Sequence, residues 1–424
     1  MYVTTDGLRA ERALLAALRL PGHRHSDVME SLAELARLAE SAGARVVGSL
    51  TQERQAPSPS LRFGKGKVGQ IRELAHEREA DLLISDDSLT PIQERNLEQS
   101  LGLKVIDRTA LILDIFAQRA RTSEGKLQVE LAQLTYLLPR LVGQWKHLER
   151  LGGGIGTRGP GETQLESDRR IIRRRIGKIE QALTHVQRHR RLLRDRRRVS
   201  GLPIVALVGY TNAGKTTLLN RLSGSAFRAA NQLFVTLDPA ARLVERPDCQ
   251  PFVLTDTVGF IRKLPPLLVA AFKATLEELH EADVILHVVD ASHPGVEEQH
   301  AVVEQLLAEL GLTGRPEIVA LNKVDRLEGP NGLRALIEEF RGVPLSALTG
   351  EGTTELLARI ELALRHRGGR ATLRIPYGDG TALTLCYERG RVLRRADEPT
   401  GIRLEVELPS QLLGAVSAYR VDVS

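Results

Sequence analysis

The sequence predicts a multidomain protein built mainly of α/β domains. Short apolar runs alternate with amphipathic helical patterns over residues 1–118 and again over 200–367, which is typical of parallel sheets flanked by helices. A long helical pattern lies between these two stretches. The length of 424 residues also exceeds what one ordinary hydrophobic core holds. We therefore predict four parts, at residues 1–118, 119–199, 200–367 and 368–424.

The composition indicates a soluble globular chain with an uneven excess of positive charge. Hydrophobic residues make up 42% and charged residues 26%, and no apolar run approaches the ~20 residues that cross a bilayer. Cys249 and Cys386 lie far apart without metal-ligand spacing, which fits a reducing cytosol. We expect a monomer in the cytoplasm, with loose membrane association as the alternative. The net charge of +6 is concentrated in arginines, which favours a polyanionic partner.

Residues 1–118 predict a small parallel sheet covered by helices. Ser26 is expected to cap a helix that ends at Gly43, and Thr90 followed by a proline is expected to start another. Probable strands are residues 44–48, 81–85 and 104–107. The loop of alternating glycines and lysines at 64–67 is better explained as a solvated turn than as a phosphate contact.

Residues 119–199 predict an antiparallel helical hairpin with a glycine-rich tip. Apolar residues recur at near-heptad spacing in both arms, from Leu127 to Leu148 and from Leu165 to Val186. Pro139 is expected to kink the first arm. Cations greatly outnumber acids in the second arm, so RNA phosphate is the expected contact, whereas a solvated face and a flexible connector are the alternatives. The proposed RNA-binding residues are Arg158, Arg169, Arg170, Arg173 and Arg174.

A phosphate-binding loop follows the apolar run at residues 204–208. The pattern G-x-x-x-x-G-K-[ST] between a strand and a helix surrounds phosphate with backbone N–H groups and adds a lysine and a hydroxyl for Mg²⁺. This chain is therefore expected to bind a nucleoside triphosphate. The residues are Gly209, Tyr210, Thr211, Asn212, Ala213, Gly214, Lys215, Thr216 and Thr217.

The base is predicted to be guanine. An aspartate carboxylate accepts two hydrogen bonds from the guanine edge, which adenine cannot donate, and a site left with unpaired polar atoms rejects the wrong base. This carboxylate belongs to the N-K-x-D pattern Asn322, Lys323, Val324 and Asp325, which follows the strand at 317–321. A further loop is suited to contact guanine O6 through backbone N–H groups: Ser346, Ala347 and Leu348.

Two elements between these motifs predict the switch segments of a Ras-like P-loop GTPase. Asp256, Thr257, Val258 and Gly259 form the D-x-x-G element. The upstream element consists of Phe234, Val235, Thr236, Leu237 and Asp238. We expect Thr216 and Thr236 to bind Mg²⁺ directly and Asp256 to bind it through water. Lys215, Thr236 and Gly259 are the residues expected to act in catalysis, and γ-phosphate loss would release both segments.

The residue after Gly259 departs from the Ras-like scheme. Ras-type enzymes carry a water-orienting glutamine there, whereas this chain has Phe260, which has no hydrogen-bonding atom. We therefore expect slow hydrolysis by the chain alone. A bound partner could supply the missing group, or Asn212 could help to hold a K⁺ ion near the phosphates. Asn212 could equally be a residue that stabilises the loop.

Residues 368–424 predict a small α+β domain. Alternating apolar residues favour strands at 381–387 and 402–408, and a short helix is expected from Pro409. An amphipathic helix from Thr353 to about Arg365 closes the preceding domain. The residues of this C-terminal part indicate no chemistry.

Taken together, these motifs resemble the HflX family of ribosome-associated GTPases, within the Obg-HflX-like superfamily. The resemblance spans roughly residues 60–350, and it implies binding of GTP and GDP, Mg²⁺, the large ribosomal subunit and its rRNA. It also implies separation of stalled or idle ribosomes under stress, with turnover stimulated by the ribosome. A ribosome-assembly or RNA-modification GTPase that acts as a GTP-timed scaffold is the alternative. The motifs lie at residues 63–67, 93–97, 107–119, 124–133, 158–166, 209–215 and 256–260.

Overall fold

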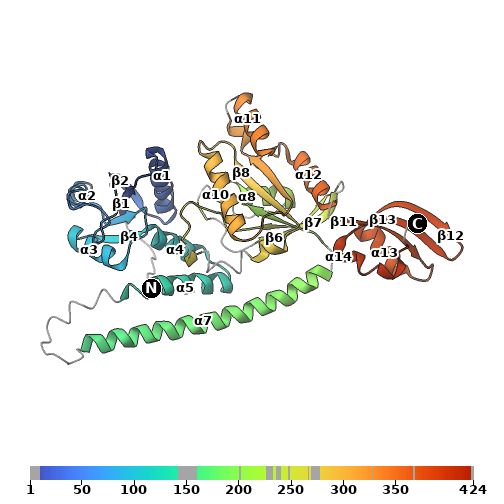
Figure 1. Ribbon diagram of the computed structural model, residues 1–424, viewed down its shortest axis with the longest axis horizontal. Coiled ribbons are helices and arrows are strands. Elements are labelled where there is room, and N and C mark those ends of the chain that lie inside the picture. The colour runs from blue at the N-terminus through green and yellow to red at the C-terminus, as the bar shows by residue number, and fades with distance from the viewer. Residues whose placement is uncertain are drawn as a thin grey trace. The chain divides into compact units, whose positions relative to one another are not determined.

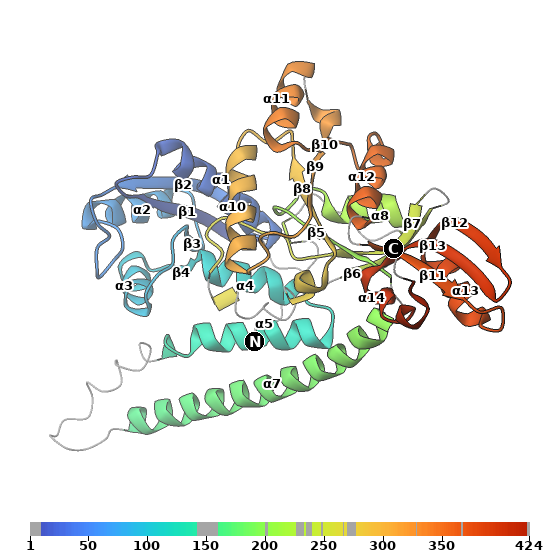
Figure 2. The ribbon, with the colours of Figure 1, turned by 45° about the vertical axis from the view of Figure 1, so that its right-hand side comes forward.

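The computed structural model describes most of the chain, which divides into two compact units. The described residues are 10–141, 160–199, 202–225, 233–234, 240–246, 249–265, 267–268, 277–327, 329–365 and 368–421. The first unit comprises Met1–His185 together with Ala230–Asp238 and Arg262–Lys273. The second unit comprises Val186–Ala229, Pro239–Ile261 and Ala274–Ser424. Figures 1 and 2 show the elements of each unit.

The first unit is built on a parallel sheet with the strand order β2-β1-β3-β4. The inner strand β1 is buried along nearly its whole length, as expected for a parallel sheet covered on both faces. One face packs Leu14, Leu18 and Leu83 against Ile71 and Leu97 of two helices. The strands are β1 (Arg12–Arg19), β2 (Arg45–Glu53), β3 (Leu82–Ser85) and β4 (Lys104–Asp107).

The helices around this sheet depart from the sequence-based expectations at two places. The first helix is capped by Arg24, not by Ser26, because the Asp27 carboxylate accepts the Arg24 N–H and fixes the first turn. The expected turn at 64–67 is instead the start of a helix, with Gly64 in the N-cap position. The strand β1 lies in a segment for which no strand was expected. The helices are α1 (His25–Ser41), α2 (Lys65–Glu77), α3 (Pro91–Leu101) and α4 (Arg108–Arg119).

Two further helices run side by side in Figures 1 and 2 and form the expected hairpin: α5 (Ser123–Leu137) and α7 (Pro160–Val199). An ion pair joins them, in which Arg175 Nε and Nη2 donate to the Glu130 carboxylate at 2.6 and 2.8 Å. Pro139 does not kink α5, because the helix already ends at Leu137. The tip, residues 142–159, lies outside the described residues.

The buried face of α5 differs from the predicted leucine stripe. Leu127, Leu131 and Leu134 are only partly buried, whereas Val129 and Ala132 are fully buried and the helix packs against α4. In α7 the predicted stripe is less exposed than the arginines around it, and its Ile179 is buried. Small residues in α5 therefore allow the close helix contact, and the leucines flank it.

The second unit holds the sheet β10-β9-β8-β5-β7-β6, parallel except for β6. Val205, Leu207, Val284, Leu286 and Val288 point from this sheet into one large apolar core. The strands are β5 (Ile204–Val208), β6 (Ala240–Arg246), β7 (Cys249–Asp256), β8 (Val284–Asp290), β9 (Glu317–Asn322) and β10 (Val343–Pro344). The helices are α8 (Lys215–Ser223), α10 (Val296–Glu309), α11 (Pro330–Phe340) and α12 (Thr353–Arg365), with the turns η2 (Glu277–Glu281) and η3 (Val324–Arg326).

The C-terminal part has an antiparallel sheet with the order β11-β13-β12. The strand predicted at 381–387 was wrong, because these residues form a helix. The Asp379 carboxylate caps it by accepting the Ala382 N–H, and helical spacing then places Ala382 and Cys386 together in the core. The elements are β11 (Gly368–Ile375), α13 (Gly380–Arg389), β12 (Arg391–Glu398), β13 (Gly401–Pro409), α14 (Ser410–Leu413) and η4 (Ser417–Tyr419).

The predicted fold class is confirmed: the protein is a multidomain α/β chain with a Ras-like domain and a small C-terminal α+β part. None of the helices in the described part combines the length and apolar character that crossing a bilayer requires.

Candidate functional site

The phosphate loop connects β5 to the N-terminus of α8, as the sequence predicts. Gly209, Asn212 and Gly214 have left-handed backbone angles, with φ of 147°, 64° and 99°. A Cβ atom on Gly209 would lie 2.2 Å from the Val288 carbonyl oxygen, and one on Gly214 would lie 2.2 Å from Asn322 Nδ2. Glycine is therefore required at both positions, since the loop is pressed against the ends of β8 and β9.

Lys215 is held inside this loop by backbone carbonyl groups. Its Nζ donates to the carbonyl oxygens of Gly209 and Tyr210 at 2.9 and 2.8 Å, and the residue is 7% exposed. Burial lowers the pKa of Lys215 to about 8; the Asp256 carboxylate partly opposes this shift, and the Lys323 charge adds to it. A phosphate bound in the loop would supply the countercharge that a buried ammonium needs.

A hydroxyl and a carboxylate meet beside the loop. Thr216 Oγ1 donates to Asp256 Oδ2 at 2.8 Å, and Asp256 is fully buried at the end of β7. The neighbouring Thr257 fixes this strand end, because its hydroxyl donates to the Leu207 carbonyl at 2.7 Å. The two strands β5 and β7 thus bring the predicted metal-binding oxygens of Thr216 and Asp256 together.

The end of the D-x-x-G element is clamped to the phosphate loop. The Phe260 N–H donates to the Gly209 carbonyl at 3.1 Å, and the Thr211 N–H donates to the Phe260 carbonyl at 2.8 Å. A Cβ atom on Gly259 would lie 3.0 Å from Lys215 Nζ, so glycine allows this close approach. The Phe260 side chain is 2% exposed. It is an apolar core residue and cannot hold a water molecule by hydrogen bonding.

Asn322 joins the predicted base-binding loops to the phosphate loop. Its Nδ2 donates to the Ala213 carbonyl at 2.8 Å, and its Oδ1 accepts the Ala347 N–H at 2.9 Å. The Ser346 N–H donates to the Glu351 carbonyl at 3.0 Å. Within the described residues we find no acceptor for the Leu348 N–H. Asp325 is exposed to solvent, as a carboxylate that recognises a ligand must be.

The remaining predicted nucleotide residues occupy the same edge of the sheet. Tyr210, Thr211, Ala213 and Val258 are buried, whereas Thr217 and Val324 are partly buried. The upstream switch element is described only at Phe234, which is buried. Its other predicted members, Val235, Thr236, Leu237 and Asp238, lie outside the described residues.

Sequence reasoning missed Asp290, at the end of β8. Asp290 Oδ2 accepts a hydrogen bond from Lys323 Nζ at 2.6 Å, while its Oδ1 accepts from the Ser292 N–H and hydroxyl at 3.1 and 2.6 Å. Lys323 has a left-handed φ of 67°, which this ion pair stabilises. The signal in the sequence was an acidic residue directly after a buried strand, the position where ligands of parallel sheets gather.

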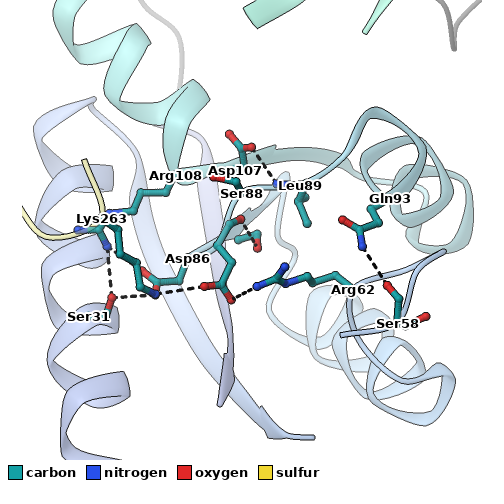
Figure 3. Close-up of polar contacts among 12 residues, drawn as sticks. Ser31, Ser58, Arg62, Asp86, Ser88, Leu89, Gln93, Asp107, Arg108 and Lys263 are labelled. Carbon is teal, nitrogen blue, oxygen red and sulfur yellow. Dashed lines mark hydrogen bonds and ion pairs between the residues drawn. The ribbon is translucent and has the colours of Figure 1, made fainter. Parts of the chain in front are cut away.

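A buried ionic network in the first unit was also missed, and it includes Lys263, which follows the D-x-x-G element (Figure 3). Asp86, 1% exposed, accepts from Arg108 Nη1 and Ser31 Oγ, each at 2.7 Å, and from Lys263. Arg108, 2% exposed, also pairs with Glu34. Burial alone would raise the pKa of Asp86, but the charges of Arg108 and Lys263 outweigh it and lower that pKa.

Phe234 of the upstream switch element packs within the first unit. The ring of Phe234 packs edge-on against Phe116 of α4, with 4.7 Å between the ring centroids. Phe116 is fully buried. Phe234 of the upstream switch element and Lys263, which follows the D-x-x-G element, are therefore held by residues of the N-terminal part.

The predicted RNA-binding arginines lie on α7. Arg170, Arg173 and Arg174 are exposed, and they form no ion pair with any described residue. Arg169 is partly buried, and Arg158 lies outside the described residues. The neighbouring Arg175 is paired with Glu130 and so is less available to a ligand.

Comparison with known proteins identifies the family of this chain. Family models match residues 29–117 (GTP-binding GTPase N-terminal), 119–197 (GTP-binding GTPase Middle Region) and 204–323 (50S ribosome-binding GTPase). The GTPase HflX of Caldanaerobacter subterraneus is 47% identical over 95% of this chain and 92% of its own. That of Escherichia coli is 46% identical over 90% of both chains, and that of Alkalihalophilus pseudofirmus is 54% identical over 79% of both. The chain therefore belongs to the HflX family of GTPases and is a GTP-hydrolysing enzyme.

Proposed function

We propose that this enzyme binds the large ribosomal subunit and uses GTP to separate stalled or idle ribosomes. Two findings support the ribosome as partner. The model that matches the GTPase domain is described as a 50S ribosome-binding GTPase. The exposed arginines of α7 form a cationic row that the described acids do not neutralise, as a phosphate-binding helix requires.

In this proposal the site recognises GTP at both ends of the nucleotide. Lys215 and the loop N–H groups neutralise the phosphates, and the positive N-terminus of α8 adds to their effect. The Asp325 carboxylate accepts from guanine N1–H and the N2 amine. The Leu348 N–H is the member of its loop that can donate to guanine O6, because those of Ser346 and Ala347 already have acceptors.

The oxygens beside the loop fit a magnesium ion. Mg²⁺ prefers oxygen ligands and usually keeps several bound waters. Asp256 Oδ2 accepts from Thr216 Oγ1 at 2.8 Å, so the carboxylate lies where it can also accept from a water bound to the ion. Thr216 would bind the ion directly and Asp256 through water, and Thr236 completes the proposed set. The ion would neutralise charge that develops on the phosphate oxygens.

Hydrolysis requires a group that orients the attacking water, and this chain has no such group at the position after Gly259. Because Phe260 is buried and apolar, the attacking water must be ordered from elsewhere. We propose that the ribosome arranges the switch segments to do so. The alternative is a K⁺ ion bound by Asn212. This residue also has a local role in the loop, because it adopts a left-handed φ of 64° that asparagine tolerates well.

Binding of the large subunit as a function of salt tests the contact with RNA. Substitution of Arg170, Arg173 and Arg174 by glutamine should weaken binding at least about tenfold and lower the salt slope by roughly 2–3, since each phosphate contact contributes ~0.7–0.9 to it. A matched control changes the exposed Arg334, Arg359 and Arg403 and so removes the same charge. Equal losses in both variants would show that only total charge matters.

Sedimentation of intact ribosomes distinguishes splitting from a GTP-timed scaffold. With a non-hydrolysable GTP analogue, splitting would show that binding energy separates the subunits and hydrolysis recycles the enzyme. Splitting with GTP alone would place hydrolysis in the separation step. Stable binding without any splitting would contradict the proposed activity and favour the scaffold.

A further inference from the structure

A second polar cluster lies in the GTPase domain, away from the groups that the nucleotide site uses. In β8, Val284, Leu286 and Val288 enter the large core beside α8, so the alternate residues face the opposite side of the sheet. His287 is on that opposite side and is 1% exposed. A buried imidazole in an otherwise apolar strand requires polar partners.

Those partners come from a neighbouring strand and a helix. Parallel pairing of β8 with β9 sets Ile285 opposite Glu317, which places Glu317 on the same face as His287. His300 and Glu304 are four residues apart on α10 and so share one side of that helix. Three elements thus direct two imidazoles and two carboxylates to one point.

The distances between these groups approach those of a metal site. His287 Nδ1 lies 3.1 Å from Glu317 Oε1 and 3.6 Å from Glu304 Oε1. The His300 ring stacks on that of His287 with 4.6 Å between centroids, and one donor atom from each of the four residues lies within 4.8 Å of the others. A tetrahedral ion with bonds of ~2.1 Å holds its ligand atoms ~3.4 Å apart. A small closing movement of His300 would complete that geometry.

The cluster also contains a buried oxygen without a partner. Glu304 Oε1 is buried and has no hydrogen-bond partner among the described residues. Burial opposes a charge on His287, but Glu304 and Glu317 outweigh it and raise the pKa of His287. Burial and the His287 charge lower the pKa of His300 to about 4. A cation bound among the four side chains would supply the partner that the Glu304 oxygen lacks.

We propose that His287, His300, Glu304 and Glu317 form a binding site for a divalent transition metal, most favourably Zn²⁺. The ion would bind the buried Glu304 oxygen together with one donor atom from each of the other three side chains. Two imidazole and two carboxylate ligands suit Zn²⁺, whereas Mg²⁺ prefers oxygen ligands alone. Four protein ligands leave no open position, so the role is structural: the ion ties β8, β9 and α10 together.

Zinc binding to the full-length protein tests this site. The protein is first stripped with a chelator, and Zn²⁺ is then titrated against a chromophoric competitor with elemental analysis of the bound metal. We expect one equivalent of Zn²⁺, released by acid, with a metal-dependent rise in the unfolding temperature.

Variants locate the ion without disturbing the buried histidine. His300→Gln and Glu304→Gln change only partly buried residues, and each should weaken Zn²⁺ binding at least about tenfold and remove the gain in unfolding temperature. His280→Gln, at an exposed histidine outside the cluster, is the matched control and should bind as the wild type does. Co²⁺ in place of Zn²⁺ should give the intense visible absorption of a tetrahedral site.

Three results would overturn the proposal: no stoichiometric Zn²⁺, equal binding by the two cluster variants and the control, or a weak octahedral Co²⁺ spectrum. GTP binding provides an independent measure of folding. It should be the same in both cluster variants, since neither residue contacts the nucleotide site.

Discussion

At the scale of single residues, the nucleotide site is assembled in advance by contacts that do not involve the ligand. Lys215 is held by two loop carbonyls, and Asn322 joins the phosphate loop to the loop at 346–348. Such preorganisation lowers the cost of ordering side chains when the nucleotide binds. Holding Lys215 buried has its own cost, which is seen in the lowered pKa of its ammonium group.

The first residue-scale prediction concerns pH. Because the pKa of Lys215 is lowered to about 8, the apo protein loses this ammonium as the pH rises through 8. A triphosphate binds the charged form, so its affinity should fall by up to tenfold per pH unit above about 8. Fluorescence titration with a labelled GTP analogue from pH 7 to about 9.5 measures this. Flat affinity over that range would contradict the account.

The second residue-scale prediction concerns the base. Asp325→Asn reverses the hydrogen bond to guanine N1, because an amide donates where the carboxylate accepts. Affinity for GTP should fall at least about 100-fold, and xanthosine triphosphate should become the better ligand. Competition between the two nucleotides measures the preference. Unchanged selectivity would refute the guanine assignment.

Residue-scale chemistry was predictable where the motif is local in sequence. The phosphate loop and the N-K-x-D motif each predict their ligand from nine consecutive residues or fewer. Asp290 was missed because its partner, Lys323, is 33 residues away and only the parallel pairing of β8 and β9 brings the two together.

At the scale of elements, Phe234 of the upstream switch element and Lys263, which follows the D-x-x-G element, contact residues of the N-terminal part. Lys263 pairs with Asp86 and with Asp87, and Phe234 packs on Phe116. Both contacts join segments more than a hundred residues apart in the sequence. A movement of either segment must therefore break buried or half-buried contacts in the first unit.

The prediction at this scale concerns the buried pair of Arg108 and Asp86. Arg108→Met removes the cation that the buried Glu34 and Asp86 carboxylates share and leaves Asp86 with Lys263 alone, which should cost about 3–5 kcal/mol of stability. The control, Arg12→Met, removes an ion pair with the largely exposed Glu79 and should cost under about 1 kcal/mol. Chemical denaturation followed by hydrogen exchange of α1 and α4 measures the local loss. Similar costs for both variants would contradict the buried network.

The same network has a predictable pH dependence. The pKa of Asp86 is lowered in the folded state, so its contribution to stability is fully present above the unfolded pKa of ~3.9. That contribution is lost as the pH falls through the lower folded value. Asp86→Asn should be less stable than the wild type at pH 6, and the difference should shrink below about pH 4. A constant difference in acid unfolding would contradict this.

Elements were predictable where periodicity and caps agree. Thr90 and Pro91 start α3 as expected, and β4 has the predicted bounds. The helix α13 was mistaken for a strand because apolar residues alternate along Thr381–Tyr387, and the Asp379 cap outside that run decides the outcome. The start of α2 was mistaken for a turn because a glycine occupies its N-cap, Gly64, and another lies in its first turn, Gly66.

At the scale of the whole molecule, the two compact units do not follow the order of the chain. Ala230–Asp238 and Arg262–Lys273, which contain or adjoin the predicted switch elements, are grouped with the N-terminal part, while the phosphate loop and Asp256 belong to the second unit. The chain therefore passes repeatedly between the two units within the stretch that contains both predicted switch elements. No local pattern in the sequence could predict this grouping, since it rests on contacts such as Lys263 with Asp86.

The most direct test is steady-state GTP hydrolysis with and without large ribosomal subunits, each in K⁺ and in Na⁺. Because Phe260 cannot orient water, we expect slow turnover by the enzyme alone and strong stimulation by the subunits in either salt. Stimulation by K⁺ without subunits would instead indicate that a K⁺ ion at Asn212 supplies the catalytic contribution that Phe260 cannot give. If neither subunits nor K⁺ raise the rate, the enzyme remains a GTPase, but the proposed ribosomal mechanism is contradicted.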